Sequence, residues 1–265
     1  MGILNVTPDS FSDGGEYKAF DAAVAHGERM ARHGADLIDV GGESTRPGAP
    51  TVDEAEEIDR VVPVIRELAR RIPAVPICVD TTKPAVAEAA LEAGAAIVND
   101  ISGLDRAPEF ADIAARHGAG LVVMHMRGTP ADMQTRANYE DVVADILAHW
   151  RRALDLARAA GVKDEAVVVD PGIGFAKTFA HNLEILGRLG ELAAFGRPVM
   201  IGLSRKSFLG RITGADARDR DPETVAATLV AASRGAHIHR VHDVAGACRA
   251  LRVWTALHAR GTDPA

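Results

Sequence analysis

Short apolar runs alternate with longer amphipathic runs along the whole chain. The short runs are rich in β-branched residues, and the longer ones repeat apolar residues at helical spacing. Eight short runs predict strands: Gly2–Val6, Asp36–Gly41, Val75–Asp80, Ala96–Asp100, Gly120–His125, Val167–Asp170, Pro198–Leu203 and His237–His242. Helices are expected after them, for example at Thr51–Arg71, Pro84–Ala93, Tyr139–Ala160 and Pro222–Ala232. Repeated βα units of this kind predict a parallel sheet covered by helices.

Eight βα units favour closure of the sheet into a (β/α)8 TIM barrel that forms a single domain over residues 1–265. An open, doubly wound sheet is the alternative, but the glycine-rich dinucleotide fingerprint is absent after the first predicted strand. The sequence starts with the first strand itself, so we expect the cover at the bottom of the barrel to be absent.

Composition and net charge limit the kinds of partner that the protein is expected to bind. The net charge of −7 and the lack of a clustered basic face argue against nucleic acid as a partner. The sequence has neither a secretion signal nor an apolar stretch long enough to cross a bilayer, so no membrane partner is expected. Cys78 and Cys248 are best interpreted as buried free thiols. These features predict a cytoplasmic protein.

Polar residues end most of the predicted strands, although barrel strands are otherwise apolar. They are Asn5, Asp39, Asp80, Asn99, Asp100, His125, Asp170, Ser204, Arg240 and His242. Barrel enzymes carry their active sites at the C-terminal ends of the strands. A single strand-end aspartate can instead cap the next helix, and this alternative stays open for Asp80 and Asp170. The ring as a whole favours catalysis at this rim.

Two kinds of ligand group fit the strand-end residues. Arg240 and His242 point to the same side of the last strand and, with Lys206, make the rim locally positive, which suits a phosphate or diphosphate. Carboxylates and an amide at Asp80, Asn99 and Asp170 match the amino-amide edge of a flat heterocycle.

Two partial motif matches carry no function. Gly172 and Gly174 precede Lys177 and Thr178, but the spacing of a phosphate-binding loop is not met. The His237 and His239 pair has no second cluster of metal ligands, so zinc catalysis is not expected.

Eight segments, in order and spread from Asn5 to Asp243, closely resemble the dihydropteroate synthase family of folate biosynthesis. They are NVTPDSFSDGG, DVGGESTRPGA, VDTTKP, NDISG, VMHMRGTP, DPGIGFAKT, LSRKSFLG and RVHDV. The resemblance implies a transferase that joins 6-hydroxymethyl-7,8-dihydropterin diphosphate to 4-aminobenzoate with the help of Mg²⁺, giving 7,8-dihydropteroate and diphosphate. Loss of diphosphate would come first and leave a cationic pterin methylene, which the arylamine attacks.

The resemblance also implies site residues. Those binding the pterin diphosphate would be Thr45, Asp80, Asn99, Asp170, Lys206, Arg240, Val241 and His242, with Arg240 across the ring plane. Those framing the aminobenzoate would be Phe11, Arg46, Pro47, Phe175 and Ser207. Asn5 would hold Mg²⁺, and the catalytic residues would be Asp9, Lys206, Arg240 and His242.

Sulfonamides, which mimic aminobenzoate, are expected to compete at its pocket, and the family expectation is a homodimer. Two other functions remain open at this point. One is a methyltransferase that moves a methyl group from a folate to a corrinoid, although such chemistry needs no diphosphate site. The other is a pterin-binding paralogue without synthase activity.

Overall fold

The computed structural model describes residues 1–7, 16–44 and 51–258. Six strands form one parallel sheet in sequence order: β1 (Gly2–Asn5), β2 (Ile38–Gly41), β3 (Ile77–Asp80), β4 (Ile97–Asp100), β5 (Gly120–Met124) and β6 (Val167–Asp170). Two further strands, β7 (Met200–Ile201) and β8 (Ile238–His239), pair with each other in parallel. Each strand lies close to its predicted position.

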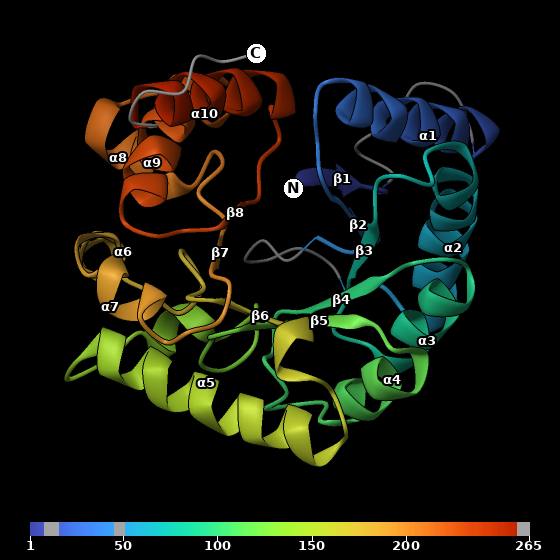
Figure 1. Ribbon diagram of the computed structural model, residues 1–265, viewed down its shortest axis with the longest axis horizontal. Helices are drawn as coiled ribbons and strands as arrows, with labels where there is room; N and C mark the ends of the chain where they lie inside the picture. The colour runs from blue at the N-terminus through green and yellow to red at the C-terminus, as the bar shows by residue number, and fades with distance from the viewer. Residues whose placement is uncertain (8–15, 45–50, 259–265) are drawn as a thin grey trace.

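Isolated bridges join the two sheets into a closed ring. Val169 of β6 bridges to Val199, which precedes β7, and Gly2 of β1 bridges to Val241, which follows β8. Backbone hydrogen bonds support both seams: Val169 N donates to Pro198 O at 3.0 Å, and Ile3 N donates to Val241 O at 2.9 Å. The predicted (β/α)8 barrel is therefore correct (Figure 1).

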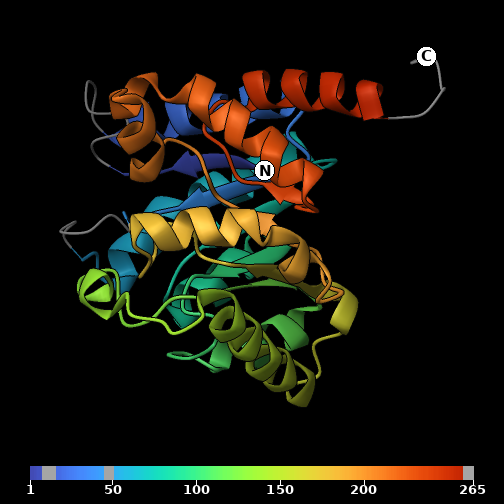
Figure 2. The same ribbon diagram turned by 90° about the vertical axis from the view of Figure 1, so that its left-hand side faces the viewer.

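Helices surround the strands (Figure 1). The first half of the chain contributes α1 (Glu16–Arg32), α2 (Glu54–Arg71), α3 (Pro84–Glu92), α4 (Glu109–His117) and α5 (Val142–Ala159). The second half contributes α6 (Phe179–Gly187), α7 (Leu189–Ala193), α8 (Ser207–Thr213), α9 (Asp221–Ser233) and α10 (Val244–His258), which run across the outside of the barrel in Figure 2. Short 3₁₀ turns occur at Met133–Arg136, Asp164–Ala166 and Ala217–Asp219.

Capping side chains explain where the structure differs from the predicted helix boundaries. The helix expected from Thr51 starts at Glu54, because the Asp53 carboxylate accepts the Glu56 amide at 2.8 Å. The helix expected from Tyr139 starts at Val142, because Asp141 accepts two amides of the first turn, each at 2.9 Å. The last two strands, predicted at Pro198–Leu203 and His237–His242, are shorter than predicted. In the second of them, the polar residues Arg240 and His242 follow the strand instead of belonging to it.

The apolar strand side chains form the core with the inner faces of the helices. Leu4, Ile38, Val79, Val98 and Leu121 are completely buried. This packing anchors the strands, so that their C-terminal ends hold the following polar residues in fixed positions. Within the described ranges, no helix combines the length and the apolar character needed to cross a membrane.

Candidate active site

A cluster of four polar residues comes from within β2, from the C-terminal parts of β3 and β4, and from the position directly after β8. The guanidinium of Arg240 spans two carboxylates: its Nε is 2.5 Å from Asp39 Oδ2 and its Nη2 is 2.6 Å from Asp80 Oδ2. Asn99 Nδ2 donates to the same Asp39 oxygen at 3.1 Å. We call Asp39, Asp80, Asn99 and Arg240 the rim cluster. It joins residues far apart in sequence because parallel strands end at the same rim.

Burial tunes the ionisation of the rim cluster. It raises the pKa of Asp80 to about 7, against the opposing effect of Arg240. Burial lowers the pKa of Arg240, but Asp39 and Asp80 outweigh this and raise it on balance. Arg240 therefore stays a cation, whereas Asp80 changes its charge near neutral pH.

A second group faces the rim from β6 and from the loop after β7. Burial raises the pKa of Asp170 to about 6, and it lowers the pKa of Lys206 to about 8, opposed by the charge of Asp170. The Lys206 ammonium lies 4.2 Å from the centroid of the Phe175 ring, a cation–π contact. A carboxylate, an ammonium and an aromatic face are thus brought together.

Glycine is required at one point of the loop after β6. Gly172 has a φ of +69°, and a Cβ there would lie 2.0 Å from the carbonyl oxygen of His125. Its amide donates to Asp170 Oδ1 at 2.7 Å. The tight turn at Gly172 therefore orients the Asp170 carboxylate.

The turn that presents Lys206 is held from α9. Arg205 has a φ of +58°, a left-handed conformation that is costly for a residue with a Cβ. Its guanidinium makes two hydrogen bonds of 2.8 Å to Asp221, and its amide donates to Thr224 Oγ1 at 3.0 Å. These contacts stabilise the turn from which Lys206 reaches the rim.

Four other predicted site residues have defined positions. Asn5 is half-buried at the end of β1, and Ser207 is exposed at the start of α8. His242 Nδ1 lies 2.8 Å from Ser204 Oγ. The Val241 side chain is buried in the core, and its backbone completes the barrel seam. The predicted residues Asp9, Phe11, Thr45, Arg46 and Pro47 lie outside the described residues.

The helix-capping interpretation of the strand-end aspartates is wrong for Asp80 and Asp170. The N-cap of α3 is Lys83 and that of α6 is Thr178. Asp100, in contrast, has a local structural role, since it accepts the amides of Ser102 and Leu104 at 2.8 and 2.7 Å.

Sequence reasoning gave no ligand role to Asp39, although this residue is the centre of the rim cluster. It is completely buried and pairs with Arg240. The available signal was a charged residue inside a four-residue apolar strand, IDVG. His239, to which the sequence assigns no role, is buried, and burial lowers its pKa to about 4.

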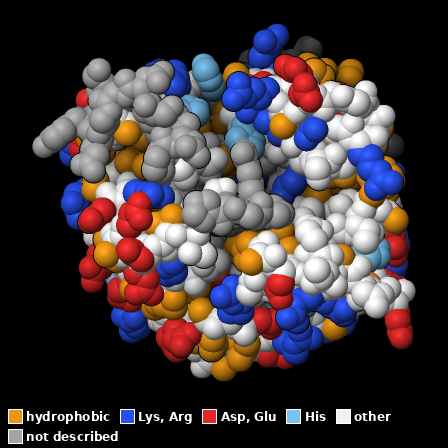
Figure 3. Space-filling view, turned by 180° about the vertical axis from the view of Figure 1, so that it is seen from behind, with side chains coloured by type: hydrophobic (Ala, Val, Ile, Leu, Met, Phe, Trp, Pro, Cys, Tyr) orange, Lys and Arg blue, Asp and Glu red, His pale blue; other side chains and the backbone are white. Residues whose placement is uncertain are grey.

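Positive charge is gathered locally on this acidic chain. The face opposite to that of Figure 1 carries basic and histidine side chains near its middle (Figure 3), although the net charge is −7. Among the described residues, no group of three or more His, Cys, Asp or Glu side chains is arranged to hold a metal ion.

The fold defines the class of protein: a (β/α)8 barrel that gathers buried ionisable groups at the C-terminal rim of its strands. The family model described as pterin binding enzyme matches residues 1–242. The dihydropteroate synthase of Synechocystis sp. PCC 6803 is 45% identical over 97% of this chain and 89% of its own length. The chain thus belongs to the dihydropteroate synthase family.

Solved structures agree with this assignment. A Xanthomonas albilineans dihydropteroate synthase with 4-aminobenzoic acid matches with a TM-score of 0.92 and 47% identity, over 98% of this chain and 93% of the other. A Yersinia pestis dihydropteroate synthase with a sulfonamide drug matches with a TM-score of 0.91 and 44% identity, over 97% and 93% of the chains. The chain is a transferase of folate biosynthesis: it condenses 6-hydroxymethyl-7,8-dihydropterin diphosphate with 4-aminobenzoate, giving 7,8-dihydropteroate and diphosphate.

Proposed function

We propose that Asp80, Asn99, Asp170 and Lys206 bind the edge of the pterin ring, and that Asp39 joins them. One observation carries this assignment: Asp39 Oδ1 and Asn99 Oδ1 are buried and have no hydrogen-bond partner within the described part of the chain. A buried acceptor without a donor costs about 1–3 kcal/mol. The amino and ring N–H groups of a pterin are donors of the kind that these oxygens lack.

The ionisation of Asp170 and Lys206 suits the same ligand. With a pKa of about 6, Asp170 is largely ionised at neutral pH and accepts two neighbouring N–H donors. Lys206 donates to a ring acceptor and stays mostly protonated, because its pKa is about 8. Arg240, held in plane by Asp39 and Asp80, would lie across the ring.

The diphosphate end is assigned to Arg240, His242, Val241 and Thr45. Breaking the C–O bond to diphosphate concentrates negative charge on the leaving group. The Arg240 cation stabilises that negative charge. The arylamine nitrogen then forms the new C–N bond, and one proton is released. The chain's own contribution is thus electrostatic and positional, with Asp9 as the remaining proposed catalytic residue.

Asn5 fits a role as the protein ligand of Mg²⁺. Its amide oxygen is a hard donor at the half-buried end of β1, and Mg²⁺ commonly takes only one or two protein oxygens and completes its shell with phosphates and water. When bound, the ion would neutralise part of the diphosphate charge. Asn5 would hold it beside the leaving group.

The aminobenzoate is assigned to Phe175 and Ser207, together with Phe11, Arg46 and Pro47. The half-buried Phe175 ring is accessible beside Lys206. Since the Yersinia pestis relative forms a sulfonamide complex, sulfonamides are proposed to compete at this pocket.

Two further proposals concern the whole molecule. Exposed apolar side chains on α8, α9 and α10, which include Ile212, Val230 and Val253, support a homodimer formed through these helices. Cys78 and Cys248 are free thiols, although only Cys78 is buried as predicted and Cys248 is half-buried. Free thiols support a cytoplasmic location. Sedimentation at several concentrations tests the dimer.

The pterin assignment is tested with Asn99→Leu, which keeps the branching of the side chain and removes the amide. The Kd of a dihydropterin ligand should rise by about 100-fold, because the hydrogen bond from the pterin to Asn99 Oδ1 is lost and its donor is left unpaired in a buried site. The Kd is measured by calorimetry with the wild type and an Asn138→Ser control, whose substituted side chain is exposed. An unchanged Kd would contradict the assignment.

A further inference from the structure

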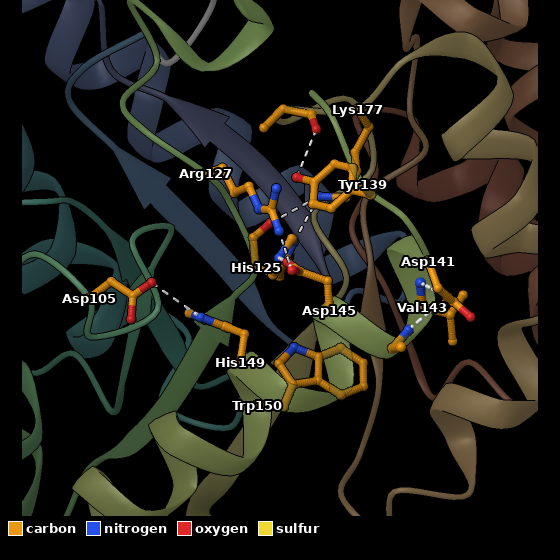
Figure 4. Close-up of polar contacts among 12 residues, drawn as sticks. Asp105, His125, Arg127, Tyr139, Asp141, Val143, Asp145, His149, Trp150 and Lys177 are labelled. Carbon is orange, nitrogen blue, oxygen red and sulfur yellow. Dashed lines mark hydrogen bonds and ion pairs between the residues drawn. The ribbon is translucent and has the colours of Figure 1, made fainter. Parts of the chain in front are cut away.

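A second set of buried polar groups lies behind the rim, between β5, α5 and the loop after β6 (Figure 4). Its centre is Lys177, whose side chain is only 3% exposed. The Lys177 Nζ atom lies 2.9 Å from His125 Nδ1 and donates to the carbonyl oxygen of Phe175, also at 2.9 Å. A lysine this deeply buried is unusual and calls for a reason.

The imidazole of His125 connects Lys177 to α5. His125 Nε2 is 2.8 Å from Asp145 Oδ1. Burial lowers the pKa of His125 to about 3, so the ring is neutral, and hydrogen bonding to His125 lowers the pKa of Asp145 to about 2, so the carboxylate only accepts. Nε2 therefore carries the ring proton, and Nδ1 accepts from the Lys177 amine.

A second branch reaches the same loop. Arg127 pairs with the other oxygen of Asp145, and its guanidinium stacks 4.2 Å from the centroid of the Tyr139 ring. The Tyr139 hydroxyl donates to the carbonyl oxygen of Ala176 at 2.9 Å. We call His125, Lys177, Asp145, Arg127 and Tyr139 the loop network.

The loop network thus fixes two successive carbonyl groups, those of Phe175 and Ala176. Ala176 has a φ of +48°, a left-handed conformation that an alanine adopts only when its surroundings impose it. The same loop presents the Phe175 ring to Lys206 on the other side. The contacts therefore link the buried network to the wall of the active site.

We infer that Lys177 is a positioning residue for the second substrate: through the Phe175 carbonyl and His125, it holds the Phe175 ring where the aminobenzoate binds. This inference rests on the proposed assignment of Phe175 to the aminobenzoate pocket. Lys177 would touch no substrate itself, and its effect would pass entirely through Phe175.

Kinetics of Lys177→Met, Phe175→Ala and the double variant test this inference. Lys177→Met removes all the donors and keeps the length of the side chain. It should raise the KM for aminobenzoate by about tenfold, the loss expected for one buried hydrogen bond, and leave the Kd of the pterin diphosphate unchanged. Lys163→Met, at an exposed lysine, is the matched control.

The double variant separates positioning from a general loss of structure. If Lys177 acts through Phe175, adding Lys177→Met to Phe175→Ala should change the KM for aminobenzoate by less than about twofold. The inference would be overturned if Lys177→Met raised this KM equally in the wild type and in Phe175→Ala. It would also be overturned if Lys177→Met weakened the binding of both substrates equally. If Phe175→Ala alone leaves this KM unchanged, the pocket assignment fails and the inference fails with it. An effect of Phe175→Ala without any effect of Lys177→Met overturns the inference alone.

A milder variant covers the case in which Lys177→Met does not fold. Tyr139→Phe removes only the hydroxyl that holds the Ala176 carbonyl. It should raise the KM for aminobenzoate by about threefold, with kcat and pterin binding unchanged, since one neutral hydrogen bond is lost. An unchanged KM for aminobenzoate in this variant would contradict the inference.

Discussion

The rim cluster and the loop network each have buried polar residues at their centre, Asp39 and Asn99 in the first and His125 and Lys177 in the second. They differ in how completely the hydrogen bonds of these residues are satisfied. In the rim cluster, Asp39 Oδ1 and Asn99 Oδ1 have no partner among the described residues. In the loop network, the Lys177 amine, both ring nitrogens of His125 and the Tyr139 hydroxyl all have partners. A site that binds a ligand leaves hydrogen-bond acceptors unpaired until the ligand arrives. A network that positions a loop pairs its donors and acceptors with one another and with the backbone.

Two lysines show the same difference at the level of one side chain. Burial lowers the pKa of both, Lys206 to about 8 and Lys177 to about 7. Lys206 faces an aromatic ring and the carboxylates of the rim, while Lys177 is held by a ring nitrogen and backbone carbonyls. Similar pKa values thus accompany different roles, and the partners of each lysine distinguish them.

The largest expected effect is that of Arg240→Met. This change leaves Asp39 and Asp80 buried beside each other without a cation, which should lower the free energy of unfolding by about 3–5 kcal/mol. Turnover should become undetectable, because the diphosphate loses its main counter-charge. Urea unfolding measures the stability, and the loss should be smaller at pH 5, where Asp80 is protonated. Full stability at pH 7 would show that the cluster does not depend on Arg240.

Lys206→Met should separate binding from stability. The kcat/KM for the pterin diphosphate should fall by about 100-fold, because a charged hydrogen bond to the ligand is lost. The free energy of unfolding should stay the same or rise, since a desolvated charge is removed from the rim. Kinetics measure kcat/KM and urea unfolding measures the stability, each for the variant beside the wild type. A large loss of stability would place Lys206 with the positioning groups.

The pH dependence of stability should distinguish Lys177→Met from the wild type. The folded pKa of Lys177 is about 7 and the ordinary value is 10.5, so between these pH values the unfolded chain binds a proton that the folded chain does not. The free energy of unfolding of the wild type should therefore rise with pH in this window, by up to about 1.4 kcal/mol per unit. Lys177→Met lacks this contribution. If the free energy of unfolding changed with pH in the same way in both proteins, the lowered pKa of Lys177 would be contradicted.

The smallest effect is expected for Tyr139→Phe, at about 1 kcal/mol of stability for one hydrogen bond. The cation–π contact with Arg127 is kept, because the ring remains. Thermal unfolding measures the change. A loss above about 3 kcal/mol would mean that the hydroxyl supports more than the Ala176 carbonyl.

Much of the fold followed from the sequence, because strand and helix periodicities repeat through the chain. The strand ends also predicted which side chains would gather, since parallel strands of a barrel end at one rim. The pairing of Arg240 with Asp39 and Asp80 could not be predicted, because it joins residues separated by 201 and 160 positions. Its geometry depends on closure of the ring.

Lys177 illustrates why the loop network could not be predicted from the sequence. In sequence it appears as the end of a failed phosphate-loop match, GIGFAKT, and nothing nearby indicates burial. Its partner His125 lies 52 residues away, on the loop that follows the neighbouring strand. Only the packing of α5 against this part of the barrel brings Asp145 to the same place.

Incubation with both substrates together shows whether the rim performs the synthase reaction. Purified protein is incubated with Mg²⁺, the dihydropterin diphosphate and 4-aminobenzoate, and diphosphate and dihydropteroate are measured beside Asp170→Asn and Lys206→Ala. If the reaction takes place at the rim, the wild type should form equal amounts of both products, and both should be lost in the variants. Pterin binding by the wild type without diphosphate release, or full turnover in both variants, would contradict a synthase reaction at the rim.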